Sequence, residues 1–178
     1  FTISMWVKPG STQIAYADII DNNHADKSFV LQQDATSTNR YYWYLVDGVY
    51  NNMIYVNLTA NVWQHITMVY NSTNGIRYLY LNGSLVGSAP TATTGVVYDG
   101  TQSLQLGKWG GGGRNWNGAM DEVRIYNVVL PESQIFSEMN TTASTSNLVA
   151  YYKMEDNIND ASTGSHTGTL VGTPVYEP

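Results

Sequence analysis

The sequence contains no cysteine. Disulfide bonds, a cysteine nucleophile and thiolate metal sites are therefore excluded. Charged residues make up only 12% of the 178 residues, about half of the usual share, and no apolar run approaches the ~20 residues of a membrane span. We therefore expect no insertion into a membrane. The chain starts at Phe1 without an initiator methionine or an apolar leader, which predicts a processed product or a piece of a longer chain.

The charge balance narrows the range of partners. The formal net charge is −6 and lysine and arginine form no cluster, so nucleic acid and anionic membrane surfaces are not expected as partners. The aromatic residues are mostly tyrosine (14) and tryptophan (5), with 3 phenylalanines. Such rings suit surfaces that contact carbohydrate, and they also suit strands in general. Together with abundant asparagine, threonine, serine and glycine, this composition indicates an extracellular or cell-surface protein.

Alternation of apolar and polar residues predicts strands. In the first ten residues, FTISMWVKPG, it places Trp6 on the face opposite to Ile3 and Met5, where Trp6 contacts a ligand or packs under a loop. The dipeptides Asp47-Gly48 and Asn82-Gly83 predict tight hairpin turns, and the second turn requires positive φ angles. One short helical turn is expected near residues 131–138.

Several segments, in this order, carry a resemblance to a known family: FTISMWVKPG (1–10), WQHITMVYN (63–71), RYLYLNGSLVG (77–87), LQLGKW (104–109) and GAMDEVRIY (118–126). They resemble a LamG-like domain of the concanavalin A-like lectin and glucanase superfamily. The resemblance implies an all-β fold, an antiparallel jelly-roll sandwich of two sheets. It does not fix a ligand, because this fold supports lectins, adhesion modules, enzymes and spacers.

The resemblance divides the chain into three parts. Residues 1–139 match a LamG-like jelly roll that lacks its first strands, and residues 140–147 form a polar linker. Residues 148–178 resemble the opening strands of the family, LVAYYKM and GTLVG with an acidic turn between them, displaced to the end of the chain. Three arrangements account for this order: a window cut from a tandem array, a circular permutation, or donation of the strands to a neighbouring repeat or subunit.

Two polar segments are candidate ligand-binding sites. DNNHAD places carboxylate, amide and imidazole groups close together, which suits calcium or a sugar but also suits a polar turn. GGGGRNWNG is a glycine-rich loop that approaches a ligand or simply joins two strands. The residues we select from these segments and from the tryptophan before the second one are Asp21, Asn22, Asn23, His24, Asp26, Trp109, Arg114, Asn115 and Trp116.

Four consecutive aromatic residues, Tyr41 to Tyr44, lie in one predicted strand. Because side chains alternate along a strand, two of the rings point to each face. Either Tyr41 with Trp43 or Tyr42 with Tyr44 provides a stacking platform for a sugar ring. The alternative is an aromatic ladder that only covers a sheet.

Asp121 stands where the last predicted strand of the jelly roll begins, which makes it a candidate metal ligand; alternatively it closes the preceding turn or pairs with Arg124. Members of the family often hold a structural calcium, and the resemblance implies that Asp121 shares such an ion with Glu155 or Asp156. The three histidines, His24, His65 and His166, are too far apart in sequence for a zinc motif.

No catalytic pattern is present. Laminarinase-type hydrolases of the superfamily carry an ExDxxE strand, which this sequence lacks, and nucleophile, phosphate-loop and metalloprotease motifs are also missing. We therefore expect no enzyme but a non-catalytic extracellular binding or adhesion module that binds glycan and is stabilised by calcium. The alternative is a structural repeat of a surface fibre or filament, assembled by strand exchange between copies through residues 148–178. Candidate glycosylation sites, if the source glycosylates, are Asn57, Asn71, Asn82 and Asn140.

Overall fold

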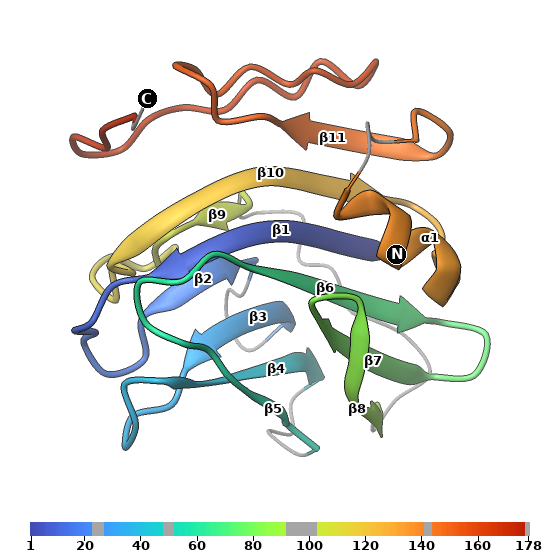
Figure 1. Cartoon of the computed structure of the whole chain (residues 1–178), viewed down its shortest axis with the longest axis horizontal. Coiled ribbons are helices and arrows are strands. Elements are labelled where there is room, and N and C mark those ends of the chain that lie inside the picture. Colours follow the sequence, from blue (N-terminus) through green and yellow to red (C-terminus); the bar gives the residue numbers. More distant parts are fainter. Residues whose placement is uncertain (23–26, 48–51, 92–102, 141–143, 177–178) are drawn as a thin grey trace.

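The computed structural model describes residues 1–22, 27–47, 52–91, 103–140 and 144–176. Two antiparallel sheets pack face to face, with strand orders β11-β10-β1-β6-β7-β8 and β5-β4-β3-β2-β9 (Figure 1). This arrangement confirms the predicted all-β jelly-roll sandwich. The strands are β1 (Thr2–Pro9), β2 (Asp18–Asp21), β3 (Lys27–Gln33), β4 (Arg40–Asp47), β5 (Ile54–Asn57), β6 (Gln64–Asn71), β7 (Ile76–Leu81), β8 (Ser84–Pro90), β9 (Gln105–Leu106), β10 (Gly118–Tyr126) and β11 (Leu148–Tyr152).

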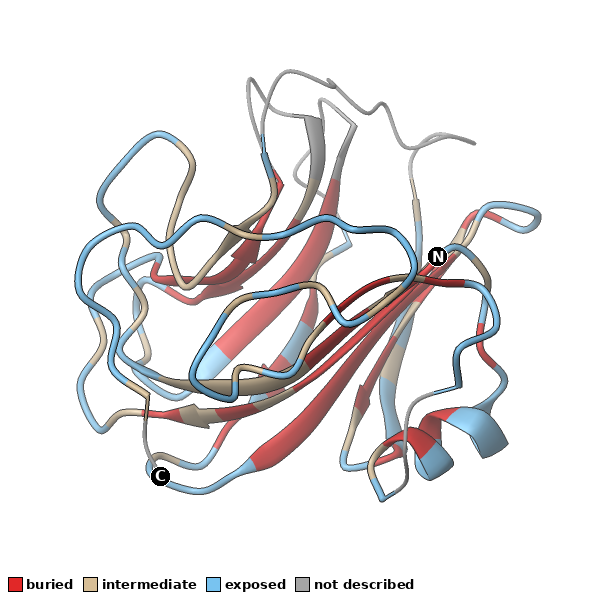
Figure 2. Cartoon of the chain, turned by 90° about the horizontal axis from the view of Figure 1, so that it is seen from above, coloured by how far each residue is buried: buried red, intermediate tan, exposed pale blue. Residues whose placement is uncertain are grey.

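The main core lies between the two sheets and follows from the alternation in each strand. Ile3 and Met5 of β1 point inward from the six-stranded sheet. They pack in the same core as Leu31 of β3 and Trp43 of β4, which point inward from the five-stranded sheet. All four side chains are fully buried. Figure 2 shows the buried residues concentrated in the paired strands and the exposed residues in the connecting loops. Burial of these apolar surfaces is the main force that holds the two layers together.

The hairpin between β7 and β8 has the predicted turn. Asn82 and Gly83 have φ angles of 49° and 76°, the left-handed conformation that a two-residue turn of this class requires. Asn82 Oδ1 also accepts a hydrogen bond from the His65 backbone N–H (2.9 Å), so this turn is fixed to the neighbouring strand β6. The other predicted turn, at Asp47-Gly48, lies partly outside the described residues.

The short helix α1 (Glu132–Glu138) covers part of the outer face of the six-stranded sheet. It begins after Pro131 with an acidic first turn, which the helix dipole favours. Ile135 is fully buried against Val69 and Tyr126, which point outward from the sheet. The helix therefore confirms the predicted helical turn. Among the described residues, no helix is long and apolar enough to cross a membrane.

A buried polar network fixes α1 and β11 to the sheet. The Arg124 guanidinium on β10 contacts the carboxylates of Glu122 and Glu138, and it lies 4.9 Å from the centre of the Tyr151 ring. The Tyr151 hydroxyl donates a hydrogen bond to Glu122 (2.6 Å). Because Arg124 is only 3% exposed, its charge depends on these partners.

Strand β11 pairs with β10 of the same chain, and the segment after it returns along the free edge of β11 (Figure 1). The backbone N–H of Ala161 donates to the Tyr151 carbonyl (2.7 Å). The second strand predicted in this region, GTLVG at residues 168–172, is wrong, because the segment has no regular secondary structure. Leu170 and Val171 are exposed there, and among the described residues no strand pairs with them. The division into parts at residues 139 and 147 stays a prediction.

The packing of α1 gives a test of the fold. Replacing Ile135 by alanine removes a fully buried side chain and leaves a cavity, so we expect the free energy of unfolding to fall by about 2–4 kcal/mol. Replacing its neighbour Gln134, which is exposed, by alanine serves as the matched control and should change it by less than about 0.5 kcal/mol. Urea unfolding followed by tryptophan fluorescence measures both values. Equal effects of the two changes would contradict the packing described here.

Candidate functional site

A row of polar side chains crosses the outer face of the five-stranded sheet. Asp18, Gln32 and Tyr42 stand opposite one another on β2, β3 and β4, and Tyr55 of β5 continues the row. The Tyr42 hydroxyl donates to Gln32 Oε1, and Gln32 Nε2 donates to Asp18 Oδ1 (2.7 Å). Tyr55, at the far end, is 46% exposed and meets the Tyr42 ring edge-on. The row therefore connects an exposed aromatic residue to a buried carboxyl group.

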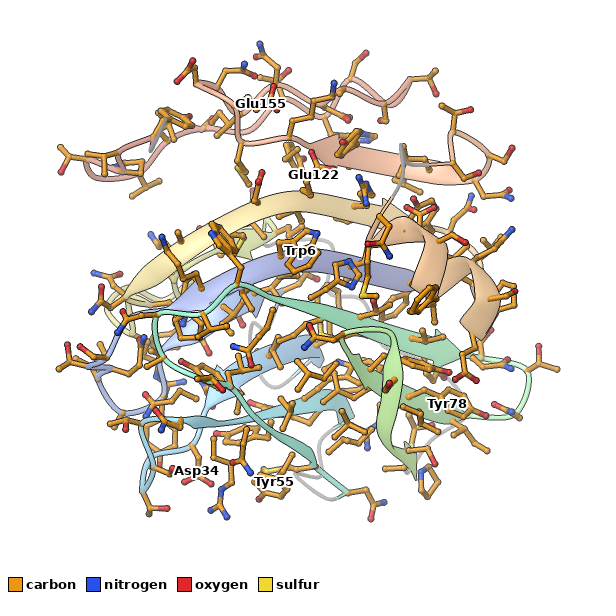
Figure 3. The ribbon with its side chains drawn as sticks, in the orientation of Figure 1. Trp6, Asp34, Tyr55, Tyr78, Glu122 and Glu155 are labelled. Carbon is orange, nitrogen blue, oxygen red and sulfur yellow. The ribbon has the colours of Figure 1, made fainter. Side chains whose placement is uncertain are left out.

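The two aromatic pairs of β4 point to opposite faces of the sheet. Tyr41 and Trp43 are fully buried in the core, so they are not available as a platform. Tyr42 and Tyr44 face outward, with ring centres 5.6 Å apart, but both are also buried, so neither pair forms an open platform. At the edge of this face, Arg40 lies over the Tyr55 ring and pairs with Asp34 (2.6 Å). Figure 3 shows Asp34 and Tyr55 on the side of the sheet that faces away from the other sheet.

The glycine-rich loop is attached to the start of β2. The backbone N–H of Asp18 donates to the Arg114 carbonyl (3.1 Å), and the N–H of Gly107 donates to the Ile19 carbonyl (2.9 Å). Gly112, Gly113 and Arg114 have φ angles of 92°, 72° and 49°. Glycine adopts such angles without strain, whereas arginine rarely does. The loop thus turns back on itself and directs the Arg114 side chain next to β2.

Arg114 lies over two aromatic rings. Its guanidinium carbon is 4.6 Å from the centre of the Trp109 ring and 5.3 Å from the centre of the Tyr16 ring. Arg114 and Trp109 are half-buried and Tyr16 is exposed. We call these three residues the Arg114 cluster. Cation–π contacts hold the guanidinium in place, and the cluster offers flat apolar surface and hydrogen-bond donors side by side.

Asp18 lies close to the Arg114 cluster but is fully buried. Burial raises the pKa of Asp18 to about 7, the Gln32 hydrogen bond opposes this shift, and the charges of Asp21 and Arg114 raise and lower it respectively. Its second oxygen, Oδ2, is buried and has no hydrogen-bond partner. A protonated carboxyl is less costly to bury than a carboxylate. Near neutral pH this residue is therefore present in both protonation states.

The residues predicted from DNNHAD do not form an open site where the structure describes them. Asp21 and Asn22 are buried, and Asp21 Oδ2 accepts a hydrogen bond from the backbone N–H of Gly110 (3.0 Å), so Asp21 helps to fix the glycine-rich loop. The three further candidates from this segment, Asn23, His24 and Asp26, lie outside the described residues.

The residues predicted from the glycine-rich loop separate into two groups. Trp109 and Arg114 meet in the Arg114 cluster, and Asn115 is exposed beside them. Trp116 instead packs against the core, and its indole N–H donates to the Tyr41 hydroxyl (3.2 Å). The side chain of Trp116 therefore holds the loop on the sandwich.

The predicted metal residues lie on the other sheet. Asp121 is inside β10 and not at its beginning; it sits at a β-bulge where Glu122 has a φ of 53°. Its Oδ1 accepts the Glu122 N–H (2.8 Å). Burial, and then the charges of Glu122 and Glu155, raise the pKa of Asp121. Figure 3 shows Glu122 and Glu155 on neighbouring segments. Of the alternatives to a metal ligand, an ion pair of Asp121 with Arg124 is not formed, because Arg124 pairs with Glu122 and Glu138.

Among the residues described, no three histidine or acidic side chains form a group that suits a metal ion. Glu155 and Asp156 are exposed.

His65 is buried beside Trp6, with ring centres 5.3 Å apart, so Trp6 packs on the outer face of the six-stranded sheet. Burial and the charge of Arg124 lower the pKa of His65 to about 4, which leaves its ring neutral at neutral pH.

The four sequons lie at strand ends, in turns or just after a helix. Asn57, Asn82 and Asn140 are exposed and Asn71 is half-buried. The Asn140 side-chain amide donates to the Phe136 carbonyl (3.3 Å).

Tyr16, Asp18 and Gln32 were not predicted from the sequence. Each is unremarkable in its own segment: an isolated tyrosine, an acidic residue before two isoleucines, and a glutamine in an apolar strand. Their significance lies in the pairing of β2 with β3 and β3 with β4. A cross-strand register between segments is not encoded by any local spacing.

Two sheets in jelly-roll order, with aromatic and polar residues on one outer face, define a lectin-like sandwich. The chain belongs to the concanavalin A-like lectin/glucanases superfamily, which matches residues 1–136. No curated protein matches it.

Three similar solved structures have low sequence identity to the chain. A Bacteroides ovatus ATCC 8483 protein, named as carbohydrate binding, is 20% identical with a TM-score of 0.75, over 92% of this chain and 49% of that protein. The chain therefore spans about half of that protein's length. The CBM40 of Ruminococcus gnavus IT-sialidase, bound to α2,3-sialyllactose, is 15% identical with a TM-score of 0.59, over 76% and 80% of the chains. A structure of botulinum neurotoxin type C, whose cell entry depends on two ganglioside molecules, is 15% identical with a TM-score of 0.59, over 81% and 36% of the chains.

The pKa of Asp18 predicts how stability depends on pH. Because the folded protein keeps this proton up to about pH 7 while the unfolded chain loses it near its ordinary value, the contribution of Asp18 to stability is complete below about pH 4 and is lost as the pH rises through 7. Asp18→Asn keeps the acceptor for Gln32 and cannot ionise. Between these two pH values, we expect the variant to gain stability relative to the wild type by about 1.4 kcal/mol for each tenfold fall in proton concentration.

Urea unfolding of both proteins at several pH values between 4 and 8 measures this gain. A difference between variant and wild type that stays constant with pH would show that Asp18 ionises normally in the folded protein.

Proposed function

We propose that this protein is a non-catalytic glycan-binding module whose ligand binds on the outer face of the five-stranded sheet, at the Arg114 cluster. The observation that carries the proposal is the placement of Arg114 over Trp109 and Tyr16. Flat aromatic surface next to fixed polar groups matches a sugar ring, which has apolar faces and hydroxyl groups around its edge.

One further exposed ring lies on this face of the sheet. Tyr42 and Tyr44 lie together on the outer face but are buried, whereas Tyr55 at its far edge is exposed. The row from Asp18 to Tyr55 crosses β2, β3, β4 and β5, so a ligand that reaches from the Arg114 cluster to the exposed Tyr55 would lie across the strands. The similar structures support the ligand class, since they include a protein named as carbohydrate binding and a module bound to sialyllactose.

The arrangement of carboxylates supports a binding function without catalysis. Glycoside hydrolysis requires two carboxyl groups that reach the scissile bond from opposite sides. Among the described residues on this face, Asp34 pairs with Arg40, and Asp18 and Asp21 are both buried. Asp18 accepts a hydrogen bond from Gln32, and Asp21 accepts one from Gly110. The carboxyl groups of Asp18 and Asp21 therefore help to fix β2 and the glycine-rich loop in place.

The proposal predicts the effect of removing one ring. Trp109→Ala deletes aromatic surface and the main support of Arg114, so we expect the affinity for any bound glycan to fall at least tenfold. Trp63→Ala is the matched control, because Trp63 also has accessible ring surface and lies under a cation, Lys8, but belongs to the loop before β6. A glycan array followed by calorimetry with the strongest binder measures the effect.

Two results of this experiment would oppose the proposal. If Trp63→Ala weakened binding as much as Trp109→Ala did, the site would not be the Arg114 cluster. If no glycan bound and the protein polymerised with increasing concentration, the structural repeat of a fibre would be the better function. Exposed apolar residues in the last segment, Leu170, Val171 and Val175, favour that second function.

We also propose that calcium binds between β10 and the segment after β11, with Asp121 and Glu155 as ligands. The supporting observation is that burial, and then the charges of Glu122 and Glu155, raise the pKa of Asp121. A cation would relieve the repulsion between these carboxylates. Asp121 and Glu155 supply only part of the six to eight oxygens that calcium prefers, so backbone carbonyls would supply the rest.

Calcium should therefore raise the melting temperature, and excess chelator should reverse the rise. Asp121→Asn should abolish this response, whereas Glu132→Gln on α1 should preserve it. A melting temperature that does not change with calcium in the wild type would exclude a stabilising ion.

A further inference from the structure

Arg114 is the one arginine whose guanidinium has no hydrogen-bond or ion-pair acceptor among the described residues. The other three arginines each have such a partner: Arg40 pairs with Asp34, Arg77 donates to backbone carbonyls, and Arg124 pairs with Glu122 and Glu138. In a chain with a net charge of −6, acceptors for a cation are abundant. The isolation of Arg114 therefore results from the way the loop holds it.

The loop fixes this guanidinium before any ligand arrives. The Trp109 and Tyr16 rings lie under it, the Arg114 backbone is in the left-handed region next to two glycines, and the Arg114 carbonyl is hydrogen bonded to β2. A ring contacts the faces of a guanidinium and leaves the N–H groups at its edge free. The side chain therefore loses little additional conformational freedom when those N–H groups bind an acceptor.

The nearest acidic groups do not neutralise Arg114. Asp18 is close enough for the charge of Arg114 to affect its pKa, but the two residues form no ion pair, and burial favours the neutral form of Asp18. Asp21 accepts a hydrogen bond from Gly110. Among the described residues, Asp21 and Arg114 are the charged groups that act on Asp18. The positive charge thus remains available at the surface of the proposed glycan site.

We infer that the glycan bound at the Arg114 cluster is acidic, and that Arg114 binds a carboxylate of a sialic or uronic acid through the free edge of its guanidinium. This inference rests on the proposed function. The planar fork of arginine matches a carboxylate with two parallel N–H···O bonds. The adjacent Trp109 ring then contacts the apolar face of the same sugar.

The test compares each acid with its own methyl ester, which keeps the shape of the sugar and removes the charge. Calorimetry with the whole chain uses 3′-sialyllactose and a glucuronic acid disaccharide, their methyl esters, and lactose as the neutral sugar. We expect at least one acid to bind tenfold or more tightly than its ester, the gain expected for a charged hydrogen-bonded pair. If only 3′-sialyllactose binds more tightly than its ester, the carboxylate belongs to a sialic acid. If only the glucuronic acid disaccharide does, the carboxylate belongs to a uronic acid.

Two variants assign the preference to Arg114. Arg114→Gln should reduce the ratio between acid and ester to about one while the ester still binds, and Arg114→Lys should retain only part of it, because lysine keeps the charge but not the fork. Lowering the pH from 8 to 6 should strengthen acid binding in the wild type, since protonation of Asp18 removes a nearby negative charge. Asp18→Asn should remove that dependence.

The outcomes separate this inference from the proposed function. If acids and esters bind equally well, or if Arg114→Gln leaves their ratio unchanged, the inference is wrong and the neutral glycan site remains. If neither acid binds while other glycans on an array do, the inference is again wrong. If no saccharide binds at all, both the inference and the proposed function fail.

Discussion

The burial of one apolar layer between two sheets constrains every other feature of this protein. Side chains alternate along a strand, so placing Ile3, Leu31 and Trp43 in the shared core forces their neighbours to the two outer faces. On the five-stranded sheet, those neighbours include Asp18, Gln32, Tyr42 and Tyr55. The polar groups on both outer faces need hydrogen-bond or ion-pair partners, and the two faces obtain them in different ways.

The outer face of the six-stranded sheet is closed by the chain itself. Helix α1 and strand β11 cover it or extend it, and a buried network around Arg124 links them to β10. A buried charge is costly unless it is paired, so the residues around Arg124 on this face are needed for stability. The outer face of the five-stranded sheet carries its polar row with an exposed end at Tyr55 and an unpaired cation beside Asp18. The asymmetry between the two faces supports placing the ligand on the second.

Local patterns in the sequence were sufficient to predict several secondary-structure elements and part of the candidate site. The Asn82-Gly83 turn, the two-faced first strand and the short helix each follow from a few adjacent residues, and the structure confirms them. The prediction of a strand at GTLVG was wrong because a strand requires a neighbouring strand to pair with, and the composition of the segment does not provide one. Trp116 and Arg114 are two residues apart in the same loop, yet one anchors the loop and the other faces outward. Only the backbone turn through Gly112, Gly113 and Arg114 separates their roles.

Asp18 and Arg114 likewise belong to one electrostatic unit although 96 residues separate them in sequence. The loop is bonded to the start of β2 through Asp18 itself, whose N–H donates to the Arg114 carbonyl. A backbone hydrogen bond thus sets the position of the cation relative to the buried carboxyl below it. If Asp18 were exposed, it would be ionised and would compete with any anionic ligand for the guanidinium. Its burial, together with the hydrogen bond from Gln32 that keeps one oxygen engaged, lets a chain of negative net charge present a local positive surface.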